Sequence, residues 1–233
     1  WLLGGAVFGI TLTAVFAGLM RSYDHNESLY ITAGWLVAHG RSLYADFSFW
    51  QMPYSAWLYA GIFGMLEPER FLLTGKLVSY GFWLGTLGVA GWWLHREFRS
   101  AAATGAMLLV LALNPTLVRC ASEASNYIQP VFLSVLGYVL AVRDAEVLPG
   151  GVGCWFGAGL CVALAVGFKL YYLPTAAAYL VVAAGFSGER HWRDRMRQAA
   201  GPFVAGGLLG IAPAVWEAAS DDAGVGGGAF EVS

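Results

Sequence analysis

The stretch VGCWFGAGLCVALAVGFKLYYLPTAAAYLVVAAGF, from Val152 to Phe186, decides the fold that we expect for this chain. It consists of two apolar runs, and the only charged residue between them is Lys169. A helix needs about 20 apolar residues to cross the hydrocarbon core of a bilayer. The stretch therefore predicts two membrane-spanning helices that are joined by a tight hairpin at Lys169.

The composition of the whole chain is also typical of a membrane protein. Of its 233 residues, 58% are hydrophobic and 12% are charged, so too few charges are present to cover a soluble core of this size. The net charge is -2, and no basic patch of the kind that binds nucleic acid is legible. We therefore expect a lipid bilayer, and no nucleic acid, among the partners of the chain.

Similar apolar runs occur along the rest of the sequence. Because lipid offers no hydrogen-bond partner to the backbone, each run is expected to be helical, which predicts an all-α integral membrane fold with about seven transmembrane helices. The predicted spans are Trp1–Met20, Phe71–Leu94, Ala101–Val118, Ile128–Val142, Val152–Phe168, Leu170–Phe186 and Ala199–Trp216. The chain starts inside an apolar run and ends in a glycine-rich stretch. We interpret residues 1–233 as a single transmembrane domain and as the N-terminal portion of a longer chain.

One connection between the apolar runs, residues 21–70, is much longer than the others. Within it, Ser28–His39 predicts a short amphipathic helix at the membrane surface that ends at Gly40. Pro53–Leu66 is apolar but too short to span, so it is expected to be interfacial or re-entrant. The long connection is thus predicted to be a structured loop on the membrane surface.

Arginine residues indicate the orientation of the chain. If Trp1 starts on the cytoplasmic side, the loops on that side are the most basic, as the positive-inside rule requires. They contain Arg96, Arg99, Arg143, Arg190, Arg193, Arg195 and Arg197. The sequence therefore predicts a multi-pass protein of the bacterial plasma (inner) membrane, with loop 21–70 on the extracytoplasmic side.

The densest polar cluster, Tyr23-Asp24-His25-Asn26-Glu27, follows the first apolar run. Asp24 and Glu27 can share one helix face, where they could form a capping box. Ionisable groups at a membrane boundary are costly, which favours a functional role for the same carboxylates. The two interpretations are compatible, and both stay open.

Three further charged residues lie in loops on the same expected face. Arg119 is either an end anchor or a functional cation, and Glu123 is either a solvated, helix-starting acid or part of a site. Lys169, in its tight hairpin, either reaches the lipid headgroups or binds an anionic partner, a carboxylate or a phosphate.

Other motifs give less information. Gly153 with Gly157, and Gly206 with Gly210, have the small-xxx-small spacing that indicates close helix packing in membranes. His25 and His39 do not form a metal-ligand set. We predict no metal site from the sequence. No cofactor is certain, and a divalent cation stays open.

Three segments of the long loop resemble a known family when taken together. They are Asp24–Tyr30 (DHNESLY), Ala38–Phe47 (AHGRSLYADF) and Gln51–Pro53 (QMP). This order is similar to the first outer loop of lipid-dependent membrane glycosyltransferases of the GT-C fold, such as the protein mannosyltransferases, the aminoarabinose transferases and the related bacterial dolichyl-phosphate-mannose-type transferases. The similarity extends through Arg119–Tyr127 and Gly167–Pro174.

The resemblance implies an inverting enzyme that moves a hexose or pentose from a polyprenyl-phosphate carrier to a lipid, glycan or protein acceptor on the extracytoplasmic face. In that family the base is an acidic residue of the first outer loop, usually within an adjacent Asp-Glu pair. Here Glu27 matches the Glu, but Asn26 occupies the Asp position, and an amide cannot accept a proton. Three alternatives follow: Asp24 has taken over as the catalytic base, Glu27 acts as the base itself, or this member is altered in activity. We favour Asp24.

The remaining predicted site residues would bind substrate. Lys169 and Arg119 are expected to neutralise the phosphate, with Glu123, Tyr30 and Tyr54 as further substrate-binding residues. The loop's aromatic residues are expected either to wall the site or to anchor the loop at the interface. They are Trp35, Tyr44, Phe49, Trp50, Tyr54 and Trp57.

The alternative is a transporter or a non-catalytic membrane subunit. A transporter is expected to carry charges within its spans and to contain internal repeats, and neither is evident in the sequence. A non-catalytic subunit predicts that the outer acids and Lys169 are individually dispensable.

Overall fold

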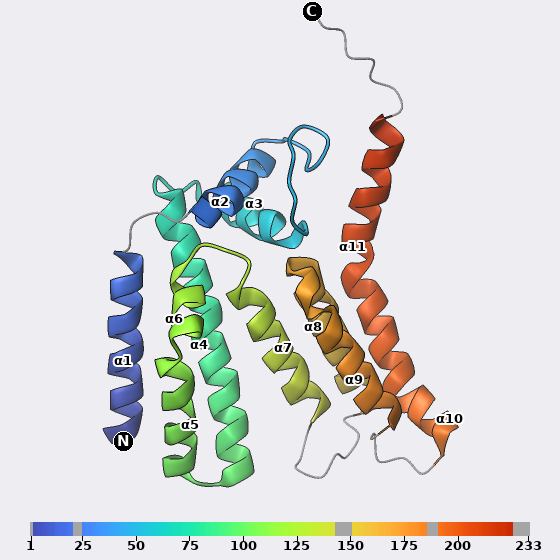
Figure 1. The fold of residues 1–233 in the computed structure, drawn as a ribbon. Helices are drawn as coiled ribbons and strands as arrows, with labels where there is room; N and C mark the ends of the chain where they lie inside the picture. Colours follow the sequence, from blue (N-terminus) through green and yellow to red (C-terminus); the bar gives the residue numbers. More distant parts are fainter. Residues whose placement is uncertain (1, 21–24, 143–150, 186–190, 226–233) are drawn as a thin grey trace, which may run out of the picture.

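The computed structural model describes residues 2–20, 25–142, 151–185 and 191–225, and these residues are almost entirely helical. An isolated bridge between Leu43 and Phe47 is the single β-type contact recorded in the described parts of the chain. The prediction of an all-α fold is therefore confirmed. Roughly parallel helices form an upright bundle, and two shorter helices lie across one end of it (Figure 1).

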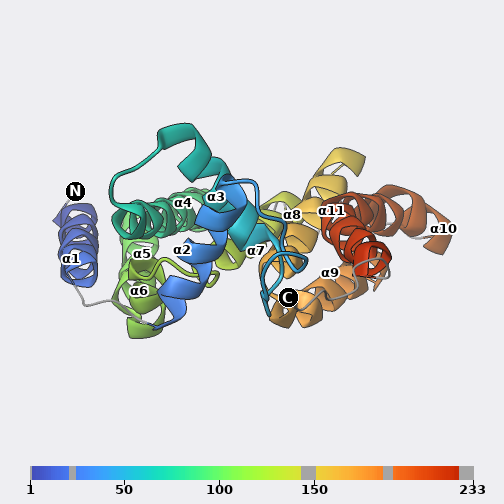
Figure 2. The same ribbon diagram turned by 90° about the horizontal axis from the view of Figure 1, so that it is seen from above.

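The helices of the bundle form an elongated row when seen from above (Figure 2), with α1 at one end and the short α10 at the other. The main helices of the bundle are α1 (Leu2–Leu19), α4 (Phe71–Phe98), α5 (Ala101–Leu113), α6 (Pro115–Ser122), α7 (Ile128–Ala141), α8 (Val152–Phe168), α9 (Leu173–Gly185) and α11 (Gly201–Val225). The short elements are the 3-10 turn η1 (Leu170–Tyr172), α10 (Trp192–Arg195) and the π-helical turn η2 (Met196–Ala200).

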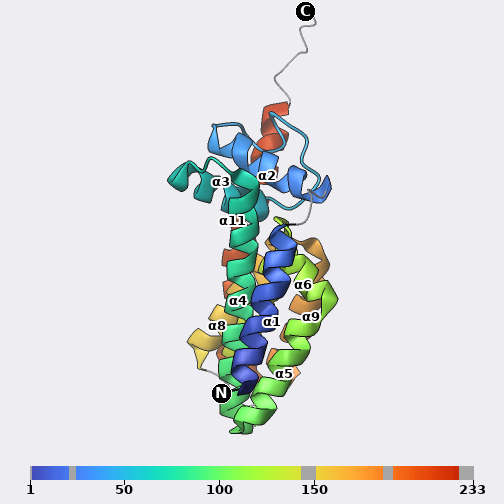
Figure 3. The same cartoon turned by 90° about the vertical axis from the view of Figure 1, so that its left-hand side faces the viewer.

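Helices α2 (His25–Ala38) and α3 (Tyr54–Leu66), with the loop between them, form a layer across the end of the bundle (Figure 3). We call residues 25–66 the platform. Helices are found at both predicted positions, α2 over most of Ser28–His39 and α3 over most of Pro53–Leu66, and the left-handed Gly40 (φ +80°) follows the end of α2 as expected. The platform has its own buried core of Tyr30, Ala33, Leu43, Phe49, Ala56, Tyr59 and Phe63.

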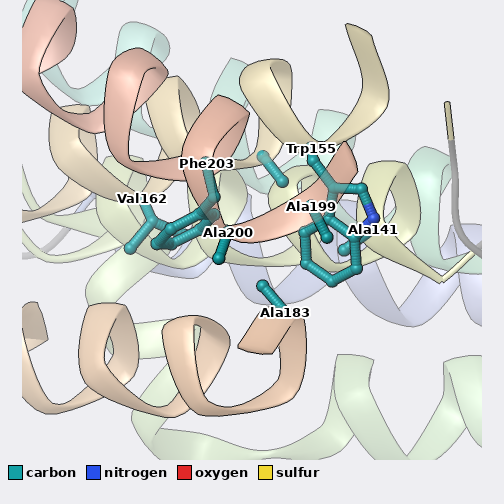
Figure 4. Close-up of a cluster of buried hydrophobic side chains, with 8 residues drawn as sticks. Ala141, Trp155, Val162, Ala183, Ala199, Ala200 and Phe203 are labelled. Atoms are coloured by element: carbon teal, nitrogen blue, oxygen red, sulfur yellow. The ribbon is translucent and has the colours of Figure 1, made fainter. Parts of the chain in front are cut away.

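A second core lies where α7, α8, α9 and α11 meet (Figure 4). The indole of Trp155 is buried there among small alanine side chains such as Ala158, Ala183 and Ala199. Small residues let these backbones approach closely: a Cβ on Gly206 would overlap the carbonyl oxygen of Phe156. The close packing predicted from the glycine spacing is thus found between α8 and α11.

The predicted close packing at Gly153 is not supported. A Cβ on Gly153 would meet no neighbouring atom among the described residues, whereas one on Gly159 would overlap the carbonyl oxygen of Phe203. The close approach on α8 is therefore centred on Gly159. Gly157 lies against α7, where a Cβ would be 3.2 Å from Leu140.

The prediction of about seven membrane spans is wrong in number. Among the described residues, one helix, Trp192–Ala219, is long and apolar enough to cross a membrane, and the bent pair α5 and α6 is a second candidate. Several of the predicted spans correspond to helices that are too short to cross a bilayer. Helices α7, α8 and α9 have only 14, 17 and 13 residues, and α4, with 28 residues, is rich in glycine and tryptophan.

The predicted span Ala101–Val118 shows this difference most clearly, because the structure divides it with a bend of 65°. Asn114 ends α5, and its side-chain Oδ1 accepts hydrogen bonds from the backbone N–H groups of Thr116 (3.0 Å) and Leu117 (3.1 Å). Pro115 then occupies the first position of α6, where its missing N–H is not needed. The Asn-Pro pair therefore starts a new helix.

Candidate functional site

A cavity of about 560 Å³ lies between the platform and the end of the bundle. Its walls come from the first turn of α2, the loop before α3, the loop between α6 and α7, and the hairpin between α8 and α9. The lining residues are Asn26, Leu29, Tyr30, Tyr44, Phe49, Trp50, Gln51, Met52, Tyr127, Lys169, Leu170 and Tyr171. Two of the sequence-predicted site residues, Tyr30 and Lys169, are among them.

Lys169 supplies the charge in this cavity. Its ammonium lies 3.3 Å from the ring centroid of Tyr127 and 5.7 Å from that of Tyr171, which are cation–π contacts. Burial lowers the pKa of the Lys169 ammonium below its usual value. Within the described residues, no carboxylate lies at ion-pair distance from this ammonium. The anionic partner predicted from the sequence is thus not a described side chain, and aromatic rings hold the cation instead.

The rest of the wall is largely aromatic. Tyr30 is buried and packs edge-to-face on Phe49, with 6.4 Å between their ring centroids. Burial raises the pKa of Tyr30, and the protonated hydroxyl can donate a hydrogen bond. Of the six aromatic residues considered as either wall or anchor, Tyr44, Phe49 and Trp50 line the cavity, and Tyr54 and Trp57 are not among its lining residues. Trp35 does not line it either, because it stacks on His39 at 4.1 Å.

Glu27 is held away from the cavity wall in a buried ion pair. Its Oε1 lies 3.5 Å from the Nζ of Lys76, and both side chains are almost fully buried, with exposures of 1% and 3%. The same oxygen accepts a hydrogen bond from the backbone N–H of Ala124 at 2.9 Å. Glu27 therefore connects α2 to α4 and to the loop that follows α6.

Asp24, the favoured catalytic base, lies outside the described residues. It directly precedes α2, and Asn26 from the first turn of that helix lines the cavity. In the sequence, Asp24 is two residues before Asn26.

The sequence interpretation missed Lys76 as a partner of Glu27. The signal that could have found the pair is a single cation within an apolar run, because such a charge needs a partner when it is buried.

The structure does not bring Arg119, Glu123 or Tyr54 to the cavity wall. The Nε of Arg119 donates to the Oε1 of Glu123 at 2.6 Å, one helical turn apart. The buried hydroxyl of Tyr54 donates to the carbonyl oxygen of Gly210 and thereby ties α3 to α11. The described partners of these residues favour structural roles over the predicted contacts with substrate.

A buried polar network lies beside the cavity and was not predicted. The Tyr59 hydroxyl donates to the carbonyl oxygen of Ser125 (3.2 Å) and accepts from the side chain of Gln129 (3.4 Å). Next to it, Asn126 is fully buried, and its Nδ2 donates to the carbonyl oxygen of Phe168 (3.0 Å). The network fixes the 123–127 loop against α3, α7 and the hairpin that carries Lys169.

The described residues contain no group of three or more His, Cys, Asp or Glu side chains that could hold a metal ion.

No family model matches this chain, and neither a curated protein nor a solved structure matches it. The cavity and its charges, together with the sequence pattern, are therefore the basis for a functional proposal.

Proposed function

We propose that this protein is a membrane-embedded glycosyltransferase that moves a sugar from a polyprenyl-phosphate carrier to a lipid, glycan or protein acceptor. The observation that carries the proposal is the Lys169 ammonium in an aromatic-walled cavity at one end of an apolar bundle. An ammonium suits a phosphate, and aromatic rings suit the faces of sugars and prenyl groups. The type of reaction, sugar transfer, is inferred from the order of the loop motifs, which resembles that of GT-C enzymes.

The surface of the bundle supports a location in a membrane. Large apolar side chains are exposed on several of its helices, as expected where lipid replaces water. They include Phe8, Leu12 and Phe16 on α1, Val110 on α5, and Leu208, Leu209 and Val215 on α11. In this arrangement Trp192–Ala219 crosses the bilayer and the shorter apolar helices pack beside it.

Arginines support the orientation. At the end of the bundle opposite the platform (Figure 1), Arg96 stacks over Trp92 at 5.9 Å and Arg193 over Trp192 at 5.7 Å. Arginine is typical of the cytoplasmic side of a membrane, and tryptophan is typical of both membrane interfaces. The platform and the cavity then face the extracytoplasmic side of the plasma membrane.

The proposed reaction is an inverting displacement. The acceptor hydroxyl transfers its proton to a carboxylate while its oxygen bonds to the anomeric carbon, and the bond from that carbon to the phosphate oxygen breaks. Lys169 neutralises the charge that develops on the departing polyprenyl phosphate.

Asp24 is the proposed base. Glu27 is committed to Lys76 and to the N–H of Ala124, and removing its charge would leave the Lys76 ammonium buried without that partner. Asp24 precedes the cavity-lining Asn26 and would take the role that the family assigns to an acidic residue of this loop.

Transfer assays with two isosteric variants test this assignment. Membranes that contain the full-length protein would receive polyprenyl-phosphate carriers bearing tritiated mannose, glucose or arabinose, one sugar at a time. Asp24→Asn should lower the rate of transfer about 100- to 10,000-fold, because a proton acceptor contributes that factor. Its thermal stability should stay close to wild type, because Asn is also a good helix cap.

Glu27→Gln is the matched variant. It should lower the unfolding temperature, with any loss of activity following the loss of folded protein. If Asp24→Asn transfers sugar at the wild-type rate, Asp24 is not the base. If no sugar moves above background with the wild type on any of the three carriers, a non-catalytic membrane subunit becomes the better account.

A further inference from the structure

Gln51 lies in the cavity wall and is fixed from two sides. Its backbone carbonyl oxygen accepts a hydrogen bond from the Tyr44 hydroxyl at 2.9 Å. Its side-chain Oε1 accepts from the Nδ2 of Asn126 at 3.5 Å. Both the backbone and the carboxamide of this residue are therefore held in place.

Asn126 determines which end of the Gln51 carboxamide is available. The Asn126 side chain is fully buried, and its Nδ2 also donates to the carbonyl oxygen of Phe168 at 3.0 Å. A backbone carbonyl can only accept, so the nitrogen of Asn126 must face Phe168, and its second hydrogen is directed to Gln51. The Oε1 of Gln51 is thereby used as an acceptor. Its Nε2, a donor of two hydrogens, has no partner among the described residues.

Tyr127, which follows Asn126 in the chain, contacts a second donor of the cavity, the Lys169 ammonium. The ring of Tyr127 lies under the Lys169 ammonium at 3.3 Å. Two consecutive residues of one loop, Asn126 and Tyr127, therefore orient an amide donor and a cationic donor that line the same cavity. The N–H of Ala124 on the buried Glu27 carboxylate anchors the start of this loop.

We propose that Gln51 is a second binding residue of this cavity and donates its Nε2 hydrogens to an oxygen of a phosphate ester. The inference rests on the proposed function and adds a specific contact to it. A fully ionised phosphate has only acceptor oxygens, so a wall that offers an ammonium and an amide N–H matches it. The Lys169 ammonium supplies the positive charge, and the amide hydrogen bond from Gln51 orients the phosphate.

Binding measurements on the purified, full-length protein in nanodiscs test the contact. The probes are undecaprenyl phosphate and its uncharged analogue undecaprenol. Gln51→Leu should weaken binding of undecaprenyl phosphate about 10- to 100-fold, the usual effect of losing a hydrogen bond to a charged group. Binding of undecaprenol should not change.

Gln51→Glu is a second, nearly isosteric variant. It removes the donors and adds a negative charge, so it should weaken phosphate binding at least as much as Gln51→Leu. Gln198, which is exposed at the opposite end of the bundle, supplies the matched controls Gln198→Leu and Gln198→Glu, and these should bind as wild type. Unfolding temperatures of all variants would be compared to separate binding from folding.

The outcomes separate this inference from the proposed function. If Gln51→Leu binds undecaprenyl phosphate like the wild type, the contact is absent, even if Gln51→Glu is impaired by repulsion. If Gln51→Leu loses undecaprenol to the same extent, Gln51 contacts the prenyl chain and the inference is wrong. If Lys169→Met, measured alongside, has no effect on undecaprenyl phosphate, the phosphate site of the proposed function fails instead.

Discussion

Two lysines lie near the boundary between the platform and the bundle, and their surroundings differ. Lys76 is inside α4 with 3% of its side chain exposed, and it faces a carboxylate that is equally buried. Lys169 follows the last residue of α8, is half-buried, and lies on the ring of Tyr127 within a cavity. The same side chain is thus paired with a carboxylate at one position and held against aromatic rings in a cavity wall at the other.

The difference follows from local structure. A lysine in the interior of a helix that packs against a neighbour must find a buried anion, because an isolated charge there is very costly. Lys169 has an extended backbone (φ -153°, ψ 115°) at the break between two helices, where its ammonium can reach a cavity. Burial and the neighbouring groups, rather than residue type, distinguish the structural lysine Lys76 from Lys169, for which we propose a binding role.

The largest expected effect is on Lys76. Lys76→Met should lower the free energy of unfolding by about 3 to 5 kcal/mol, because it removes one charge of a buried ion pair and keeps the other. Denaturant titration of the protein in detergent micelles would measure the change. Lys169→Met should cost much less stability, because its ammonium is partly solvated.

The double variant Lys76→Met with Glu27→Gln is the control for this prediction. It removes both charges and should recover part of the lost stability. A single Lys76→Met variant as stable as the wild type would mean that the buried pair is not structural, and the contrast between the two lysines would be lost.

A smaller effect is expected where Tyr127 holds Lys169. Tyr127→Leu removes the ring but keeps an apolar side chain, so undecaprenyl phosphate should bind about 2- to 30-fold more weakly, as a cation–π contact of this kind predicts. Tyr138→Leu, on α7 and away from the cavity, is the matched control. Equal affinities of Tyr127→Leu and wild type would show that the ring does not position the ammonium.

The smallest effect is a shift of binding with pH. Burial lowers the pKa of Lys169, so its charged form is present below that pKa and is lost as the pH rises through it. Between pH 7 and pH 10 the phosphate of the probe stays ionised, since its second pKa is about 6. Wild-type affinity should therefore fall across this range. The affinity of Lys169→Arg should stay constant, because guanidinium keeps its charge.

The sequence predicted the platform well because its signals are local. Gly40 after an amphipathic stretch, and Pro53 before an apolar one, mark helix ends that depend only on nearby residues. The hairpin at Lys169 was also legible, since one charge separates two apolar runs. These features placed Tyr30 and Lys169 correctly in one region.

The features that the sequence did not predict depend mainly on contacts between distant segments. Nothing near Lys76 in the sequence indicates that its partner is Glu27, and nothing near Gln51 indicates Asn126. The number of spans was overestimated because apolar runs continue through turns such as Leu170–Tyr172. The pair Asn114-Pro115 is a typical signal for the start of a helix, but it lies within a long apolar run that we interpreted as one span.

The central claim is that Lys169 makes this cavity a site for a polyprenyl phosphate, and one binding measurement tests it most directly. Undecaprenyl phosphate and undecaprenol would be titrated into nanodiscs that contain wild type, Lys169→Met, or Arg70→Met as a control at the same end of the molecule. Lys169→Met should lose about 2 to 5 kcal/mol of binding free energy for the phosphate and none for the alcohol, with Arg70→Met unchanged. Equal binding of undecaprenyl phosphate by wild type and Lys169→Met would contradict the account.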